Sequence, residues 1–323
     1  MTATAQALWI TGQERVAYKE QPLADAPDHC HVRTLFTGIS RGTERLVFRG
    51  QVPVGEHATM RAPFQEGDFD FPVKYGYAAV CQIESGDRAG DIAFALLPHQ
   101  TRFVVPDSAL IPVPEPVPAA RAVLAANMET AVNITWDAQI GVGDRVVVVG
   151  CGVVGALTAY LAAQVPGATV TLTDIDPSKR ALAEALGCDF AEPDTLGDDA
   201  DVVIHASASA GGLGTAIQCA GVEARVVEAS WYGATSVEAP LGGRFHQRRL
   251  QLISSQVGRI PATQAARWNY QRRLTLALSL LADARLDQLI SGETAFDGLA
   301  AAYSDILDDP KTLCHRVRYA TDE

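Results

Sequence analysis

Three closely spaced glycines carry the clearest chemical signal in the sequence. Gly150, Gly152 and Gly155 have the spacing G-x-G-x-x-G, directly after the apolar stretch RVVVV and before an apolar run long enough for a helix. The first glycine permits a tight turn, the second lets the backbone approach a pyrophosphate, and the third lets the helix pack on the strand. The start of that helix, at Val153 and Val154, adds N–H groups and a positive dipole end for the phosphates. This order predicts a dinucleotide site.

Asp174 indicates which dinucleotide the site prefers. It lies at the end of a second predicted strand, ATVTLTDID. A carboxylate there accepts hydrogen bonds from the ribose diol of NAD and repels the 2′-phosphate of NADP. NAD is therefore the expected cofactor, while Lys179 and Arg180, shortly downstream, keep NADP as the alternative.

Two further apolar strands extend the predicted site. DVVIHASAS and ARVVEASWYG have small residues at their carboxyl ends. Open parallel sheets bind ligands in the crevice outside the carboxyl ends of their strands. Ala206, Ser207 and Trp231 are therefore predicted neighbours of the cofactor. For Trp231, packing between domains is an equally good interpretation.

Composition excludes several classes of partner. The chain has 323 residues, with 26 Lys and Arg against 38 Asp and Glu, so its net charge is −12. Such a charge repels phosphate backbones and anionic lipids, and we expect neither a nucleic acid nor a membrane partner. The six scattered cysteines favour buried thiols in a reducing compartment. Since no targeting segment or long apolar run is seen, a cytoplasmic location is expected.

Three stretches of different texture predict an α/β protein with two domains. Residues 1–118 contain short alternating apolar runs broken by Gly and Pro, which is typical of an irregular β-rich domain, and the Pro-rich stretch 111–118 is interpreted as a linker. Residues 119–258 alternate strand and helix, as in the doubly wound parallel sheet of a Rossmann domain. The tail 259–323 contains one amphipathic helix, YQRRLTLALSLLADARL, and a last strand near HRVRY. We expect this tail to return to the first domain.

This arrangement resembles the medium-chain dehydrogenase/reductase superfamily over nearly the whole chain. GISRGTE resembles its first active-site turn, and FPVKYGYAAVCQIESGDRAGD resembles its second segment. AANMETAVNITWDA resembles the helix that supplies a third metal ligand and a cofactor-contacting Thr or Ser. The resemblance implies a GroES-like catalytic domain, hydride transfer with a nicotinamide, and cofactor contact by Thr130. It also implies a homodimer formed through the last strand of the Rossmann sheet, RRLQLISSQVG.

The positions that bind catalytic zinc in that superfamily hold other residues here. Ser40 replaces the usual Cys, Tyr77 and Ala78 replace a His-Glu pair, and Asn127 replaces the third ligand. Zinc prefers thiolate, imidazole or carboxylate ligands, and the four closely spaced cysteines of a structural zinc site are missing from the sequence as well. We therefore expect no bound metal. The alternative is a site that the fold assembles from His29, Cys30, His31, His57 and His99.

Among zinc-free branches, GISRGTERLVFRG is most similar to the elbow of bacteriochlorophyllide a dehydrogenases. Members of that group oxidise a hydroxyethyl side chain of a tetrapyrrole to an acetyl group. The likeness is tightest at residues 38–50 and looser elsewhere. Aromatic residues expected near the cleft also hint at a bulky or planar substrate: Phe48, Phe64, Tyr75, Tyr77, Trp231 and Tyr232. An ordinary aromatic core would give the same set.

Without a metal, the reacting oxygen must be managed by hydrogen-bond donors or a general acid. In related enzymes the elbow directs its side chains at that oxygen, so the hydroxyls of Ser40 and Thr43 are the first candidates. Tyr77 can donate from its phenol, or it can merely fill the vacated space. A histidine suits proton exchange near neutrality, which makes His99 a candidate, with a structural hydrogen bond as the alternative. Glu44 is interpreted as the structural partner of an arginine; the alternatives are a general base or a group that orients Arg41, Ser40 or a water.

Three functional interpretations follow. The leading one is a zinc-independent, NAD-preferring oxidoreductase acting on an alcohol/carbonyl pair. The second is an NADPH-dependent quinone or enone reductase, against which Asp174 and the S-x-G-T-E elbow count. The third is a dinucleotide-binding sensor or scaffold without catalysis, because drift to a non-enzyme would also remove all three zinc ligands.

Overall fold

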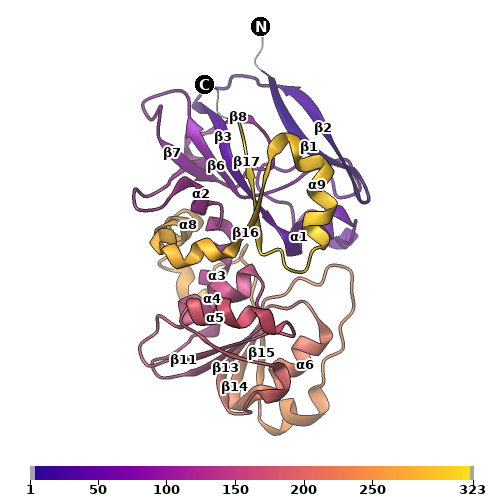
Figure 1. Ribbon diagram of the computed structural model, residues 1–323, viewed down its shortest axis with the longest axis vertical. Coiled ribbons are helices and arrows are strands. Elements are labelled where there is room, and N and C mark those ends of the chain that lie inside the picture. The colour runs from indigo at the N-terminus through magenta and orange to yellow at the C-terminus, as the bar shows by residue number, and fades with distance from the viewer. Residues whose placement is uncertain (1–3, 321–323) are drawn as a thin grey trace. The chain divides into compact units, whose positions relative to one another are not determined.

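The computed structural model describes residues 4–320, which fold as two compact units (Figure 1). Unit 1 contains the chain up to Ala126 and again from Leu274, and unit 2 contains Asn127–Arg273. A β-rich unit and a parallel-sheet unit together confirm the predicted α/β class. The domain boundaries predicted from the sequence, at residues 118 and 258, lie earlier in the chain than the two junctions between the units. Helix α3 (Ala125–Ala138) runs through the first junction and helix α8 (Tyr270–Ser279) through the second.

Unit 1 has two sheets that are mostly antiparallel. The larger has the order β16-β17-β3-β6-β7-β9, and β8 also pairs with β3. Its strands are β3 (His29–Ser40), β6 (Ala79–Ile83), β7 (Ile92–Ala95), β8 (Arg102–Pro106), β9 (Ile111–Pro112), β16 (Ile290–Ala295) and β17 (Cys314–Arg318). The smaller has the order β2-β1-β5-β4 and consists of β1 (Thr4–Gly12), β2 (Arg15–Pro22), β4 (Glu66–Gly67) and β5 (Val73–Lys74).

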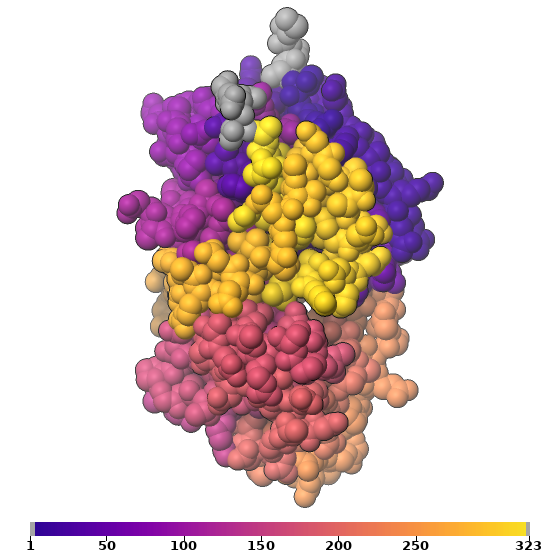
Figure 2. Space-filling model, in the orientation of Figure 1, coloured from indigo at the N-terminus to yellow at the C-terminus, as the bar shows by residue number. Residues whose placement is uncertain are grey.

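The C-terminal tail returns to unit 1, as the sequence predicted. β17 pairs antiparallel with β3, so that Cys314 lies opposite Ser40. Helix α9 (Phe296–Asp308) packs on α1 (Arg41–Phe48) and on β2. In Figure 2 this C-terminal segment, coloured yellow, lies beside the indigo N-terminal strands of the same unit. The C-terminal elements β17 and α9 therefore pack against the elbow, residues 38–50, which lies near the start of the sequence.

The strands of unit 1 bury their apolar side chains in the core of the unit and expose most of their polar side chains. Along β1 buried residues alternate with more exposed ones, and β2 presents mostly exposed side chains, as expected for a sheet with one face on the core and one in water. The larger sheet contributes a cluster of buried apolar residues: Val32, Ala79, Cys81, Ile83, Ala93, Ala95, Leu97, Phe103, Val105 and Leu110. All six cysteines are free, and all except Cys30 are buried, as predicted for thiols.

Unit 2 is a Rossmann domain with a six-stranded parallel sheet. The strand order is β12-β11-β10-β13-β14-β15, which is the doubly wound order in which the first strand lies at the centre. The strands are β10 (Arg145–Val149), β11 (Thr169–Thr173), β12 (Asp189–Ala191), β13 (Ala200–His205), β14 (Ala220–Glu228) and β15 (Gln251–Ser254). Helix α4 (Val153–Ala162) packs on β10 and β11, and α6 (Ala210–Cys219) packs on β10, β13 and β14. The near-continuous apolar run in β10 is explained by burial on both faces of the sheet.

The amphipathic helix predicted in the tail is shorter than expected. The stretch YQRRLTLALSLLADARL was predicted as one helix, but α8 ends at Ser279 and two 3-10 turns follow, Leu280–Ala282 and Ala284–Leu289. The Asp283 side chain accepts a hydrogen bond from the backbone N–H of Arg285, which starts the second turn and competes with continuation of the helix. Within residues 4–320, the helices are all too short or too polar to cross a membrane.

Candidate functional site

The glycine turn of unit 2 has the geometry that a dinucleotide requires. Gly150 has φ +108°, and a methyl group on it would lie 2.9 Å from the backbone of Ser207. A methyl group on Gly155 would overlap the carbonyl oxygen of Gly150, so only glycine lets α4 pack this close to β10. At Gly152, by contrast, a methyl group would meet no protein atom within 4 Å, so the turn leaves open space there. The three glycines therefore fit the three roles that the fingerprint predicts.

Asp174 follows β11 and lies beside the glycine turn. Its Oδ2 accepts a hydrogen bond of 2.7 Å from the backbone N–H of Cys151, and its Oδ1 accepts one of 3.0 Å from the N–H of Asp176. The carboxylate thus holds the turn in place. Because each carboxylate oxygen has a second lone pair, the side chain can still accept hydrogen bonds from a ribose.

The remaining predicted cofactor residues occupy three places in unit 2. Ala206 and Ser207 follow β13, and the backbone N–H of Ala206 donates to the Val149 carbonyl oxygen at 2.9 Å. They therefore lie at the carboxyl ends of the central strands, together with the turn and Asp174. The half-buried Trp231 follows β14, and the half-buried Thr130 lies in α3.

A buried glutamate organises the elbow of unit 1. Glu44 lies in α1 and is 1% exposed. Its Oε1 accepts a hydrogen bond of 2.8 Å from the backbone N–H of Ser40, the residue that precedes the helix. Its Oε2 accepts one of 2.8 Å from the Tyr303 hydroxyl and lies 3.0 Å from His99 Nε2. Glu44 therefore pairs with a histidine and a tyrosine, and the pairing with an arginine that the sequence left open is wrong.

His99 is enclosed on both sides of its ring. It is 1% exposed, with Nε2 on Glu44 and Nδ1 2.7 Å from the Thr37 hydroxyl. The Thr37 hydroxyl in turn lies 3.3 Å from the hydroxyl of Tyr319. We call Glu44, His99, Tyr303, Thr37 and Tyr319 the Glu44 cluster. Both ring nitrogens of His99 are occupied within it, which favours a role in holding the elbow.

Tyr77 brings a phenol to the hydroxyls of the elbow. Its side chain forms hydrogen bonds with the side chains of Ser40 and Thr43. Burial, reinforced by the negative charge of Glu44, raises the pKa of Tyr77 to about 12, so the phenol stays protonated at neutral pH. The residue before it, Gly76, has φ +127°, and a methyl group there would lie 3.2 Å from the His99 ring. Glycine at this position therefore lets the Tyr77 segment pass close to His99.

All five predicted chemical residues of unit 1 lie around one elbow. Ser40 is buried, while Thr43 and Tyr77 keep part of their surface exposed. The hydroxyls of this arrangement can donate hydrogen bonds to an oxygen atom of a ligand. Glu44 holds the backbone N–H of Ser40, and His99 contacts Glu44. Sequence reasoning missed the other three members of the Glu44 cluster, Thr37, Tyr303 and Tyr319. No local motif marks them, because they reach the elbow from β3, α9 and the residue after β17.

The side chains at the positions aligned with the superfamily's zinc ligands do not fit a zinc site. A hydroxyl, a phenol with a raised pKa and an amide stand at Ser40, Tyr77 and Asn127, and none of these is a good zinc ligand. Across residues 4–320, no three His, Cys, Asp or Glu side chains are grouped so as to hold a metal ion. The histidines proposed for an alternative site have separate partners: His29 with the Pro27 carbonyl, His31 with Asp25, His57 with the Val52 carbonyl, and His99 with Glu44.

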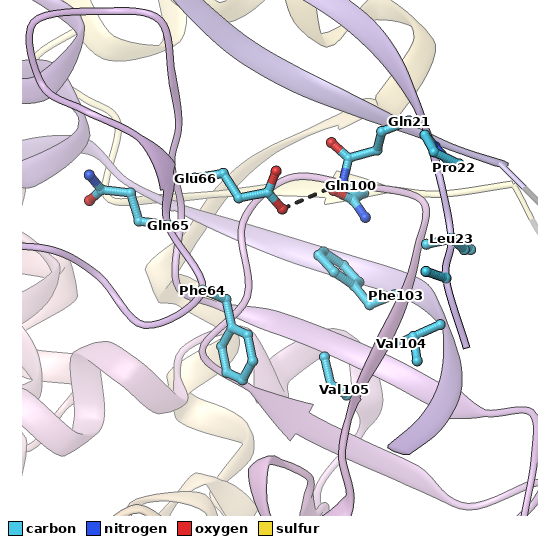
Figure 3. Close-up of a pocket in the computed structure, with 11 residues that line it drawn as sticks. Gln21, Pro22, Leu23, Phe64, Gln65, Glu66, Gln100, Phe103, Val104 and Val105 are labelled. Atoms are coloured by element: carbon cyan, nitrogen blue, oxygen red, sulfur yellow. Dashed lines mark hydrogen bonds between the residues drawn. The ribbon is translucent and has the colours of Figure 1, made fainter. Parts of the chain in front are cut away.

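Unit 1 also has a surface pocket of about 290 Å³ outside the Glu44 cluster (Figure 3). Phe64, Phe103 and Val105 line one part of it, and Gln100 and Glu66 bring polar groups to another (Figure 3). The buried ammonium of Lys74 lies 2.5 Å from Glu66 Oε1 and from Gln100 Oε1. Since these polar groups already satisfy one another, the pocket shows no donor set directed at a ligand.

Sequence comparisons find local similarity to two L-threonine 3-dehydrogenases. The protein from Rhizobium rhizogenes is 31% identical over 99 residues, which cover 31% of this chain and 28% of that protein. The protein from Mesorhizobium japonicum is 34% identical over 85 residues, which cover 26% of this chain and 24% of that protein. The chain thus spans less than a third of the length of the curated relatives that it matches. No family model matches it.

Solved structures match the chain over nearly its whole length. L-idonate 5-dehydrogenase from Escherichia coli has a TM-score of 0.80 at 16% identity, covering 98% of this chain and 99% of that one. A protein of Sinorhizobium meliloti described as a zinc-binding dehydrogenase, bound to NADP, has a TM-score of 0.76 at 17% identity with the same coverage. A short chain alcohol dehydrogenase from Escherichia coli complexed with NADH has a TM-score of 0.76 at 18% identity, covering 98% and 99%. The chain therefore has the fold of these dehydrogenases, with a GroES-like unit and a Rossmann unit.

Proposed function

We propose that this protein is a zinc-independent, NAD-preferring oxidoreductase that transfers hydride between nicotinamide and an alcohol/carbonyl substrate. The observation that carries the proposal is the hydroxyl group of Tyr77 beside those of Ser40 and Thr43, at the elbow where related folds place a metal ligand. Hydroxyl donors held in a fixed geometry can stabilise charge on a reacting oxygen in place of a Lewis acid.

The residues of unit 2 fit the cofactor that the fold implies. Gly152 would let the backbone approach the pyrophosphate, the N-terminus of α4 would face the phosphates, and Asp174 would bind the ribose. NAD, when bound, accepts or supplies the hydride. Two of the structural matches contain NADP and NADH, respectively, which supports a nicotinamide cofactor.

The residues of unit 1 would manage the oxygen of the substrate. With a pKa of about 12, Tyr77 keeps its proton at neutral pH and donates a hydrogen bond. Thr43 is partly exposed and offers a second donor, while Ser40 is buried and supports the Tyr77 phenol from behind. Glu44 and His99 hold the start of α1 through the backbone N–H of Ser40. In this proposal they are positioning residues, and Tyr77 and Thr43 touch the substrate.

We further propose a substrate class, a mode of dimerisation and a location. The likeness of GISRGTERLVFRG to bacteriochlorophyllide a dehydrogenases supports a bulky or planar alcohol, such as a tetrapyrrole side chain. β15 is the last strand in the order of the Rossmann sheet, and the half-exposed Leu252 on it supports a homodimer through this edge. We also propose a cytoplasmic location. The net charge of −12 argues against a nucleic-acid or membrane partner.

Chelator treatment should leave the activity of this protein intact. Absorbance of the reduced nicotinamide is followed with a panel of alcohols and carbonyls, before and after removal of metals, and zinc is measured by elemental analysis. We expect turnover with at least one alcohol/carbonyl pair, clearly substoichiometric zinc, and no loss of rate after chelation. Stoichiometric zinc with loss of rate on its removal would refute zinc independence, and turnover of enones alone would favour the reductase alternative.

NADH should bind more tightly than NADPH, and Asp174 should be the reason. Replacing Asp174 by asparagine keeps one oxygen acceptor but removes the charge that repels a 2′-phosphate. Because hydrogen bonds to a charged group are the strong ones, we expect the preference for NADH over NADPH to shrink by about 10-fold or more in Asp174→Asn. Fluorescence titration of both proteins with both cofactors measures this. Tighter binding of NADPH by the unaltered protein would contradict the prediction.

A further inference from the structure

Unit 2 also contains a buried histidine, His205, which connects the ends of two strands of the Rossmann sheet. His205, the last residue of β13, is 0% exposed. Its Nδ1 lies 2.7 Å from Glu228 Oε2 at the end of β14, and its Nε2 lies 2.7 Å from the hydroxyl of Ser207. Tyr232 donates to the same Glu228 oxygen at 3.0 Å, and the backbone N–H of Ser230 donates to Glu228 Oε1 at 2.8 Å. We call these residues the His205 chain.

The charge of Glu228 fixes the direction of the hydrogen bonds that it accepts in the His205 chain. Burial alone would raise the pKa of Glu228, but the hydrogen bonds from His205 and Ser230 outweigh it and hold the pKa below its ordinary value. Glu228 is therefore a carboxylate, which only accepts. The His205 Nδ1–H donates to it. In the neutral form of the ring Nε2 is then an acceptor, and the Ser207 hydroxyl donates its proton to Nε2.

Ser209 links the Ser207 hydroxyl to the first turn of helix α6. Its hydroxyl accepts the backbone N–H of Gly212 at 3.0 Å and lies 2.9 Å from the Ser207 hydroxyl. Since Ser207 has already donated its proton to His205, Ser209 donates to Ser207. A methyl group on Gly212 would overlap Ser207 Oγ, so α6 packs directly against these hydroxyls. The proton positions are thereby determined from Glu228 through His205 to the first turn of α6.

Ser207 is exposed, and it lies against the dinucleotide turn. A methyl group on Gly150 would stand 2.9 Å from the N, Cα and Cβ atoms of Ser207. The next residue, Ala208, has φ +52°, and its N–H donates to the Ser230 hydroxyl at 3.0 Å, which holds the backbone there. With its own proton directed inward to His205, Ser207 presents a lone pair outward. An acceptor repels a phosphate oxygen but binds a hydroxyl or amide N–H.

We propose that His205 is a positioning residue for the dinucleotide. It holds the Ser207 hydroxyl as a hydrogen-bond acceptor for a donor group of the cofactor, either a hydroxyl of the nicotinamide ribose or the carboxamide N–H. Glu228 and Tyr232 keep His205 in the tautomer that this requires. This inference rests on the dinucleotide site of the proposed function and adds the chemistry of the group that faces Ser207.

Binding titrations of the full chain with NADH, ADP-ribose and ADP test the proposal. Ser207→Ala removes the acceptor, and His205→Asn keeps a donor for Glu228 but leaves Ser207 free to turn. Both should weaken NADH binding about 3–10-fold, which corresponds to one ordinary hydrogen bond. His205→Gln, whose amide oxygen can reach the position of Nε2, should recover part of the loss. His246→Asn, at an exposed histidine, is the matched control and should bind NADH as the unaltered protein does.

The smaller ligands identify the donor group on the cofactor. ADP ends at the pyrophosphate and lacks both the nicotinamide ribose and the carboxamide. The Ser207→Ala variant should therefore bind ADP as tightly as the unaltered protein does. Weakened ADP-ribose binding would assign the contact to the ribose hydroxyl, and unchanged ADP-ribose binding would assign it to the carboxamide; either supports the proposal.

Three outcomes would overturn it. If the unaltered protein binds NADH and both variants bind it equally well, the role of His205 is wrong and the proposed function stands. If ADP binding falls as much as NADH binding, the substitutions disturb the turn as a whole. If the unaltered protein does not bind NADH, the dinucleotide proposal fails together with this one. Because Ser207 is exposed, Ser207→Ala should fold even if a His205 variant does not.

Discussion

Replacing Tyr77 by phenylalanine is expected to lower kcat about 100-fold or more, the usual effect of removing one preorganised donor from a reacting oxygen. The Tyr77 phenol stays protonated and lies beside the hydroxyls of Ser40 and Thr43. Phenylalanine removes the phenol oxygen but keeps the ring that fills the space. NADH affinity should stay unchanged, because the glycine turn and Asp174 belong to unit 2. Initial rates from absorbance of the reduced nicotinamide, together with NADH titration, measure both quantities.

Tyr75 supplies the matched control for this prediction. Its ring lies 5.9 Å from the ring of Tyr77 in an edge-on arrangement, and it is more deeply buried. Tyr75→Phe therefore changes a neighbouring phenol in the same segment without removing the donor at the elbow, and kcat should change much less. Equal rates for Tyr77→Phe and the unaltered protein would show that Tyr77 only fills the space that a metal occupies in related folds.

The glycine turn of unit 2 was predictable because its signal is local. Gly150, Gly152 and Gly155 lie within one strand, turn and helix, and the structure shows a steric reason for Gly150 and Gly155 and open space at Gly152. Asp174 lies one strand further along and contacts the same turn through Cys151. The prediction needed no long-range contact beyond the pairing of β10 with β11, which consecutive parallel strands make by default.

The partners behind the elbow could not be predicted in the same way. Tyr303 contacts Glu44 across 259 residues of sequence, and this contact exists only because β17 pairs with β3 and brings α9 onto α1. The His205 chain was missed for another reason. His205 and Glu228 each lie at the end of a strand whose other residues are mostly apolar, and the strand signal concealed them. An ionisable residue that ends an apolar strand was the available clue, because such a group needs a buried partner.

Glu44 is expected to make a large contribution to the stability of unit 1, because it is buried and accepts hydrogen bonds from several groups. Replacing it by alanine should lower the free energy of unfolding by about 3 kcal/mol or more, because each buried donor left without an acceptor costs about 1–3 kcal/mol. His99 Nε2, the Tyr303 hydroxyl and the Ser40 N–H would each lose an acceptor in an environment that is almost fully excluded from water. Chemical denaturation of the full chain measures this loss.

Two further variants separate the hydrogen bonds of Glu44 from its bulk. Glu44→Gln keeps one oxygen acceptor but turns an amide N–H toward a donor, so we expect a smaller loss of about 1–3 kcal/mol. Glu56→Ala removes an exposed carboxylate from the same unit, and its free energy of unfolding should stay within about 0.5 kcal/mol of the unaltered protein. If Glu44→Ala proved as stable as Glu56→Ala, the cluster would not be holding the elbow. Tyr77, Ser40 and Thr43 would then need another source of their fixed geometry, because the Ser40 N–H on Glu44 is the contact that ties the start of α1 to the buried side chains.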